Sequence, residues 1–135
     1  MNTKNALERL SLFLGEDFLL HPRFLDELSS LIAKELKGKE ERFFKILATQ
    51  LSNIKNFGIM VHTVDSNEQI HGGDGHFFSI HLQQSQFNIR FLIYIRDDGK
   101  AFFLCAFYER SNKKATDYTK YTPILSSRLN YFKED

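Results

Sequence analysis

A run of alternating apolar residues over 88–96, followed by Asp98 and Gly99, constrains the fold of this chain more than any other feature. Apolar side chains at every second position are typical of a β-strand with a buried face. Because Asp-Gly favours a two-residue hairpin turn, residues 102–108 are predicted to return as the next strand. This register pairs Ile95 with Phe102, Ile93 with Leu104, Phe91 with Ala106, and Ile89 with Tyr108.

Helical spacing of apolar residues dominates the first part of the chain. We expect an N-terminal helical extension over 1–20, with a short helix at 5–14 and a linking segment from 17 to 20. Pro22 starts a second helix, which is predicted to end at Lys37 and Gly38. A third helix follows from residue 39, and the short connection between the two predicts an antiparallel helical hairpin.

Strands are expected at 58–64 and 76–82, separated by a polar, glycine-rich loop. In the second strand, Phe78, Ile80 and Leu82 are expected to face the core. The chain is predicted to return to helix from 115 to 132. This order predicts an α+β fold with the helices on one face of the sheet. An N-terminal helical hairpin packs on a mostly antiparallel, twisted sheet, and a C-terminal helix follows.

The size and composition fit a single domain, 1–135, because 42% of its 135 residues are hydrophobic. Every apolar run is shorter than the roughly 20 residues that span a bilayer. The N-terminus also lacks a signal-peptide pattern, so a cytoplasmic protein is expected. The single cysteine, Cys105, excludes an internal disulfide and is interpreted as a packed strand residue rather than a nucleophile.

Four histidines fall close together in the sequence and suggest a metal site: His62, His71, His76 and His81. Their spacing matches no compact ligand motif, so ordinary strand and loop histidines are the favoured interpretation, and no metal or cofactor is expected. The loop from Gly72 to Gly75 lacks the Lys-Ser/Thr pair of a phosphate-binding loop, so a mobile turn is favoured there.

A second constellation has the side chains needed to cleave RNA without a metal. The reaction needs a base for the 2′-hydroxyl proton, an acid for the leaving oxygen, and cations for the charge on the phosphorane. Residues of these types are His81, Arg90, Arg110, Lys113, Lys114 and Tyr118. Arg90 is the first candidate for a functional residue, because an arginine within an apolar strand is expected only at the sheet surface or in a functional role. In the alternative reading, Lys113 and Lys114 lie in a solvated turn and Tyr118 belongs to the core.

Positive charge is concentrated near the C-terminus. Between Arg110 and Arg128 the only acidic residue is Asp117, and the basic residues are Arg110, Lys113, Lys114, Lys120 and Arg128. A local basic patch fits an anionic partner. Because the whole chain carries a net charge of only +1, general adhesion to long nucleic acids is not implied.

Three consecutive segments form one pattern: the strand from Asn88 with its Asp-Gly turn, the strand that ends in the polar run 109–114, and the tyrosine-containing helix that ends near Arg128. This pattern resembles the RelE/ParE toxin superfamily, in particular its phage-type HigB-like branch. The likeness covers 22–132 as a RelE-like core. By position it implies catalytic roles for His81, Arg90, Arg110, Lys113 and Tyr118, and RNA-binding roles for Lys114, Lys120 and Arg128.

The resemblance implies a toxin that cuts mRNA on the ribosome without a metal and is held inactive by a cognate antitoxin protein. We expect the antitoxin to cover the patch between Arg110 and Arg128 with an acidic or amphipathic segment. Two alternatives remain open at this point. In the first, the chain is a non-catalytic, phage-derived or degenerate toxin-like module that binds a partner protein. In the second, it inhibits gyrase as ParE does.

Overall fold

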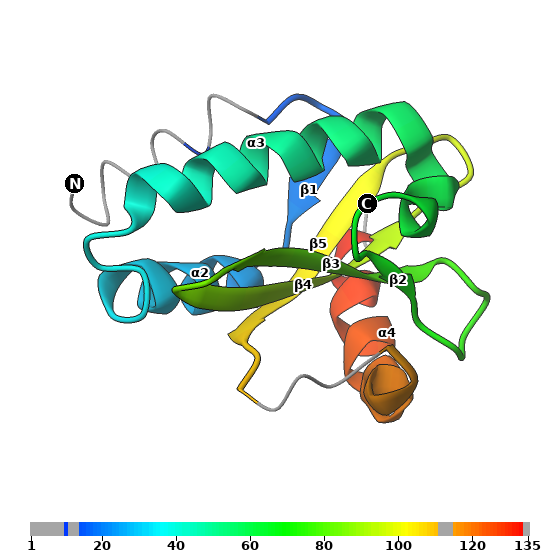
Figure 1. Cartoon of the computed structure of the whole chain (residues 1–135). Helices are drawn as coiled ribbons and strands as arrows, with labels where there is room; N and C mark the ends of the chain where they lie inside the picture. Colours follow the sequence, from blue (N-terminus) through cyan, green and yellow to red (C-terminus); the bar gives the residue numbers. More distant parts are fainter. Residues whose placement is uncertain (1–9, 11–13, 111–114, 134–135) are drawn as a thin grey trace.

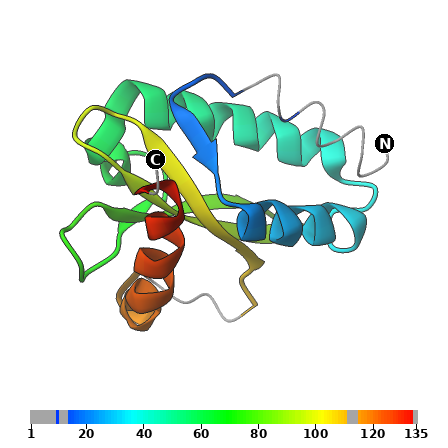
Figure 2. The ribbon, with the colours of Figure 1, turned by 180° about the vertical axis from the view of Figure 1, so that it is seen from behind.

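A computed structural model of the chain describes Leu10, residues 14–110 and residues 115–133. The described elements are β1 (Phe18–Leu20), α2 (Pro22–Ala33), α3 (Glu40–Phe57), η1 (Gly58–Thr63), β2 (Glu68–Gln69), β3 (Phe77–Gln84), β4 (Phe87–Ile95), β5 (Ala101–Tyr108), η2 (Ala115–Tyr121), α4 (Thr122–Asn130) and η3 (Tyr131–Lys133). The strands form one mixed sheet, with α2 and α3 on one face and α4 on the other (Figure 1 and, from behind, Figure 2). The predicted α+β class is confirmed.

The strand order is β1-β5-β4-β3-β2, and β1 runs parallel to β5 while the other pairs are antiparallel. The expectation that 17–20 only links helices is wrong, because β1 forms there and precedes both α2 and α3. The described chain therefore does not begin with a helical hairpin. Apart from Leu10 and Leu14, the helix expected at 5–14 lies outside the described residues.

The helices predicted from Pro22 and from residue 39 are both present, as α2 and α3. At the start of α2, the ring Nδ1 of His21 accepts a hydrogen bond from the backbone N–H of Arg23 at 2.9 Å, which caps the helix. This helix ends at Ala33, earlier than expected, and turns lead to Gly38 at φ +82°. Carboxylates in the first turn of α3 complement its helix dipole.

The strand expected at 58–64 is wrong, because this segment forms the 3-10 helix η1. Its apolar side chains do not alternate between a buried and an exposed face. Val61 is buried, whereas Ile59 and Met60 are exposed. One short strand, β2, forms within the loop that follows and pairs with β3.

The β4–β5 hairpin has the predicted strands but a longer turn. The N–H of Gly99 donates to the carbonyl of Arg96, and the N–H of Arg96 donates to the carbonyl of Lys100, both at 2.9 Å. The loop thus has three residues and ends with Gly99 at φ +89°. As a result, Ile95 pairs with Ala101 and Ile93 with Phe103, so the predicted pairs Ile95–Phe102 and Ile93–Leu104 are wrong.

A β-bulge between Leu92 and Ile93 restores the predicted register farther from the turn. Leu104 is the extra residue of β5, and beyond it the predicted pairs Phe91–Ala106 and Ile89–Tyr108 are confirmed. The bulge sends Leu104 and Cys105 to the same side of the sheet. Strict alternation would have exchanged the faces of Phe102 and Phe103.

Each sheet face has its own hydrophobic core. The core under α2 and α3 includes Phe24, Phe43, Leu47, Phe78, Phe91 and Phe103. The core under α4 consists of Ile70, Phe77, Leu92, Phe102, Leu104, Tyr118, Leu125 and Leu129. The expectation of helices on a single face is therefore wrong, because β4 and β5 are apolar on both sides and each side needs a cover.

Among the helices of the described residues, none has both the length and the apolar character required to cross a membrane.

Candidate functional site

The sheet brings His81 and Arg90 together. His81 on β3 and Arg90 on β4 are direct cross-strand partners, so their side chains leave the same face of the sheet. That face is covered by α4 and η2, because Leu92, two residues after Arg90, belongs to the core under α4. Two candidates that are nine residues apart in the sequence thus become neighbours.

Arg90 is buried, with 3% of its surface exposed. Its Nη1 donates a hydrogen bond to Oδ1 of Asn88. Its Nε is buried and has no hydrogen-bond partner among the described residues. An unpaired buried donor costs about 1–3 kcal/mol, so Arg90 retains a donor that an anionic group would satisfy.

Tyr118 completes the cluster from η2. Its side chain is fully buried, and its hydroxyl donates to Oε1 of Glu109 at 2.6 Å. Burial and then the contact with Glu109 raise the pKa of Tyr118, whereas the neighbouring charge and hydrogen bond of Arg90 lower it, with a net rise. The tyrosine is therefore a protonated donor at pH 7. We refer to His81, Arg90, Glu109 and Tyr118 as the arginine cluster.

His81 is a neutral side chain at pH 7. Burial and then the positive charge of Arg90 lower the pKa of His81 to about 4. Its Nε2 lies 3.2 Å from Oε1 of Glu68, without the alignment of a hydrogen bond. The ring can accept a proton from a neighbour, although a pKa near 4 makes it a weak base.

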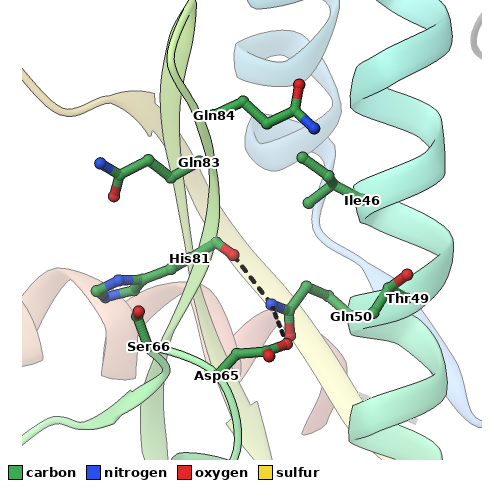
Figure 3. Close-up of a pocket in the computed structure, with 8 residues that line it drawn as sticks. All are labelled: Ile46, Thr49, Gln50, Asp65, Ser66, His81, Gln83 and Gln84. Atoms are coloured by element: carbon green, nitrogen blue, oxygen red, sulfur yellow. Dashed lines mark hydrogen bonds between the residues drawn. The ribbon is translucent and has the colours of Figure 1, made fainter.

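The backbone at His81 is held by a network of buried amides. The side chain of Gln50 donates to the carbonyl of His81 at 3.0 Å (Figure 3). The N–H of His81 donates to the side chain of Asn67 at 2.9 Å. Asn67 also donates to Gln50, and Asn53 and Gln50 both donate to Asp65. These contacts provide hydrogen-bond partners for the backbone of β3 at His81, which lies beyond the residues paired with β2. They also fix the position of the imidazole on the strand.

A hollow of about 390 Å³ lies between α3 and this part of β3, with Ile46, Thr49 and Gln50 on the helix side (Figure 3). The His81 ring points to the opposite side of the strand from Gln50 (Figure 3). His81 thus lines the hollow and also belongs to the arginine cluster, while its ring lies on the side of the strand away from Gln50.

The basic candidates that the structure describes besides Arg90 contact other groups. Arg110 lies on the α2 side, where it pairs with Glu35 at 2.9 Å and stacks on Tyr108. Lys120 is exposed beside the ring of Tyr121. Arg128 binds Glu27 and the carbonyl of Leu104. Lys113 and Lys114 lie outside the described residues.

The histidine-rich segment has structural contacts. His76 Nδ1 lies 2.7 Å from the carbonyl of Ile95, and His62 stacks on Phe78. Asp74 accepts hydrogen bonds from the His76 N–H and the Tyr94 hydroxyl, which tether the glycine loop to β4. Within the described part of the chain, no three side chains of His, Cys, Asp or Glu are arranged to hold a metal ion.

Sequence reasoning missed Glu109 and the amide network around Gln50. The signal for Glu109 was its position directly after an apolar strand, two residues beyond the cross-strand partner of Arg90. No local pattern marks Gln50, because Asp65, Asn67 and the His81 carbonyl, which it joins, lie 15 to 31 residues away.

Comparison of this chain with protein-family models, with curated proteins and with solved structures finds no match.

Proposed function

We propose that this chain is a toxin of the RelE/ParE type, which acts in the cytoplasm as a ribosome-dependent, metal-independent endoribonuclease on mRNA. The observation that supports it best is the cross-strand pair of His81 and Arg90, with the hydroxyl of Tyr118 in contact with the same arginine. A base, a cation and an acid are the groups that metal-free RNA cleavage requires.

In the proposed reaction, the 2′-oxygen attacks the adjacent phosphorus and the bond to the 5′-oxygen breaks. His81 takes the 2′-hydroxyl proton, and Tyr118 gives a proton to the leaving oxygen. Arg90 stabilises the additional negative charge on the phosphorane through its guanidinium. The products are a 2′,3′-cyclic phosphate and a 5′-hydroxyl end.

The other basic candidates have different roles in this proposal. We leave Arg110 and Arg128 out of the proposed reaction, because Arg110 pairs with Glu35 on the α2 side and Arg128 pairs with Glu27. Lys120 is exposed and suits a contact with the RNA backbone. A cognate antitoxin would cover the basic patch that includes Lys113 and Lys114. Replacing both lysines with glutamate would then weaken the complex.

A specific observation favours a second candidate function, a non-catalytic protein-binding module. Arg90 and Tyr118 are only 3% and 0% exposed. Because the Tyr118 hydroxyl contacts both Glu109 and Arg90, RNA would compete with these contacts for the guanidinium. In a binding module the same cluster would hold η2 against the sheet and contact no substrate.

Programmed ribosomes and purified protein separate the two functions. The 5′ and 3′ ends of the mRNA are mapped after incubation with the wild type and with the Arg90→Lys, His81→Gln and Tyr118→Phe variants. We expect new cuts with the wild type and cleavage at least about tenfold slower for each variant, since a positioned acid or base contributes roughly 10²–10⁴-fold.

Tyr131→Phe is the matched control, because it removes one hydroxyl from an exposed ring outside the cluster. Circular dichroism of each variant checks that the fold is intact. Absence of cuts with the wild type, or equal cleavage by all folded variants, rejects the nuclease. If expression of the protein in cells arrests growth and damages DNA, but no mRNA cuts are found, the target would be gyrase instead.

A further inference from the structure

A small pocket lies at the turn end of β4 and β5, beside the C-terminal end of α4. Its volume is about 230 Å³. Three aromatic rings from three elements line it: Tyr94 from β4, Phe102 from β5 and Phe132 from η3. The rings of Phe102 and Phe132 meet edge to face with centroids 5.0 Å apart, and Tyr94 lies 6.3 Å from Phe102. We call this site the turn-end pocket.

The remaining polar lining of the turn-end pocket is cationic. Arg96, Lys100 and Lys133 line it, and none of its lining residues is acidic. The guanidinium carbon of Arg96 lies 5.6 Å from the centroid of Phe102. Arg96 pairs with Asp98, but within the described residues no ion pair is formed by Lys100 or Lys133. The pocket therefore presents, next to aromatic rings, two ammonium groups that form no ion pair among the described residues.

We propose that the turn-end pocket binds a nucleotide, with the planar base against Tyr94, Phe102 and Phe132 and the phosphate between Lys100 and Lys133. Stacking of bases on aromatic side chains beside a positively charged groove is the general mode for single-stranded nucleic acids. The same chemistry is offered by a free nucleotide and by one nucleotide of an RNA strand.

Pocket size favours a nucleotide over an acidic peptide. The volume of about 230 Å³ is smaller than the roughly 300–1,000 Å³ typical of small-molecule and cofactor pockets, so it accommodates the base alone, with the sugar and phosphate outside. An extended peptide would also need partners for its backbone amides. The lining of this pocket supplies aromatic rings and positive charge instead.

This inference goes beyond the proposed nuclease function. Arg96 lies just after β4 and six positions beyond Arg90, which is about 20 Å along a strand. Binding at the turn-end pocket requires no cleavage and no contact with the arginine cluster. It therefore stands or fails independently of the reaction.

Isothermal titration of the full chain tests the pocket with adenosine 5′-monophosphate, adenosine, inorganic phosphate and a six-nucleotide single-stranded RNA. We expect one saturable site for the monophosphate, and weaker binding of adenosine and of phosphate alone. Lys100→Glu combined with Lys133→Glu should lower the affinity at least about tenfold, and Phe132→Leu should lower it by roughly fivefold or more.

Lys45→Glu combined with Lys55→Glu is the matched control, because it makes the same charge change at two exposed positions of α3 on the opposite face of the sheet. Its affinity should stay within twofold of the wild type, where about 0.4 kcal/mol corresponds to a factor of two. Binding of the RNA but not of the monophosphate, with the same sensitivity to the pocket variants, supports an RNA strand as the source.

Three results would overturn the proposal. The first is no binding of either nucleotide probe. The second is an affinity that the pocket variants leave unchanged. The third is that an acidic, tryptophan-containing peptide binds the pocket whereas both nucleotide probes fail.

Discussion

The side chains of Glu27 and Arg128 meet around the open edge of β5, with Arg128 Nη1 3.0 Å from Glu27 Oε1. β1 covers β5 only as far as Phe103, and beyond that point the edge lacks a strand. Glu27 accepts the N–H of Ala106 at 3.0 Å, and Arg128 donates to the carbonyl of Leu104 at 2.6 Å. One ion pair thus supplies hydrogen-bond partners for the backbone N–H of Ala106 and the carbonyl of Leu104 at the bulge, and it joins α2 to α4.

Removing Arg128 should destabilise the protein substantially. Arg128→Met would leave the carbonyl of Leu104 and the carboxylate of Glu27 without their partner in a largely buried setting. We expect a loss of about 2–3 kcal/mol in the free energy of unfolding, measured by urea denaturation. Arg110→Met is the control, because its pair with Glu35 has a similar length of 2.9 Å but a side chain that is 66% exposed. That variant should lose less than about 1 kcal/mol. Equal losses would contradict the structural role of Arg128.

The buried amide of Gln50 should contribute similarly on the other edge of the sheet. Gln50→Ala removes donors to Asp65 and the His81 carbonyl, and the acceptor of Asn67. We expect a destabilisation of about 2–3 kcal/mol in urea, since several buried polar groups lose their partners. Gln84→Ala makes the same change at an exposed position of β3 and should stay within about 0.5 kcal/mol. A neutral Gln50 variant would show that water replaces the network at no cost.

Stability should fall as the pH drops from about 6.5 to about 4, because His81 resists protonation when folded. The pKa of His81 is lowered from 6.5 to about 4 by burial and then by Arg90. In this window the unfolded chain binds the proton and the folded chain does not, so acid favours unfolding. The contribution, on the order of 3 kcal/mol, is complete above the unfolded pKa and lost by about pH 4.

Unfolding free energies of the wild type and His81→Gln at pH 7.5, 5.5 and 4.5 isolate this effect. The variant should lose less stability with acid than the wild type does. His71→Gln replaces an exposed histidine and should keep the pH dependence of the wild type. Parallel pH curves for all three proteins would refute the assignment to His81.

The left-handed backbone at Gly99 should resist substitution. Gly99→Ala meets no atom within 4 Å of the new Cβ, so the cost comes from φ +89° alone. We expect a loss of about 1 kcal/mol in thermal or urea unfolding. Gly15→Ala also meets no atom within 4 Å, at a position without a left-handed φ, and should be neutral or slightly stabilising. If both variants are neutral, the three-residue turn is not strained by a side chain.

The local patterns of the sequence were sufficient to predict α2, α3 and the three long strands. Each has a regular apolar period, and burial on a helix or strand depends mainly on that period. The same patterns placed Phe78, Ile80 and Leu82 on one buried face of β3, which is confirmed by the core under α2 and α3. They also placed the Asp-Gly turn correctly, though not its length.

Some features of the candidate site could also be predicted from local patterns, whereas others depend on tertiary contacts. That His81 and Arg90 share a face followed from the alternation of their strands, although their direct pairing needed the register of β3 on β4. The opposite positions of Arg110 and Arg90 also depend on strand parity. The burial of Tyr118 against Glu109 depends on how η2 returns to the sheet, and no periodicity in the sequence describes that return.

By itself, the sequence determined which segments are helices and long strands, because local spacing controls which side chains can be buried together. Only the tertiary structure decided how the edges of the sheet are satisfied. The bulge at Leu104, the short strand β1 and the roles of Glu27 and Gln50 all follow from backbone groups that need hydrogen-bond partners far away in the chain. Arg128 illustrates the difference, because its charge was visible in the sequence, whereas its partner Glu27 is 101 residues away.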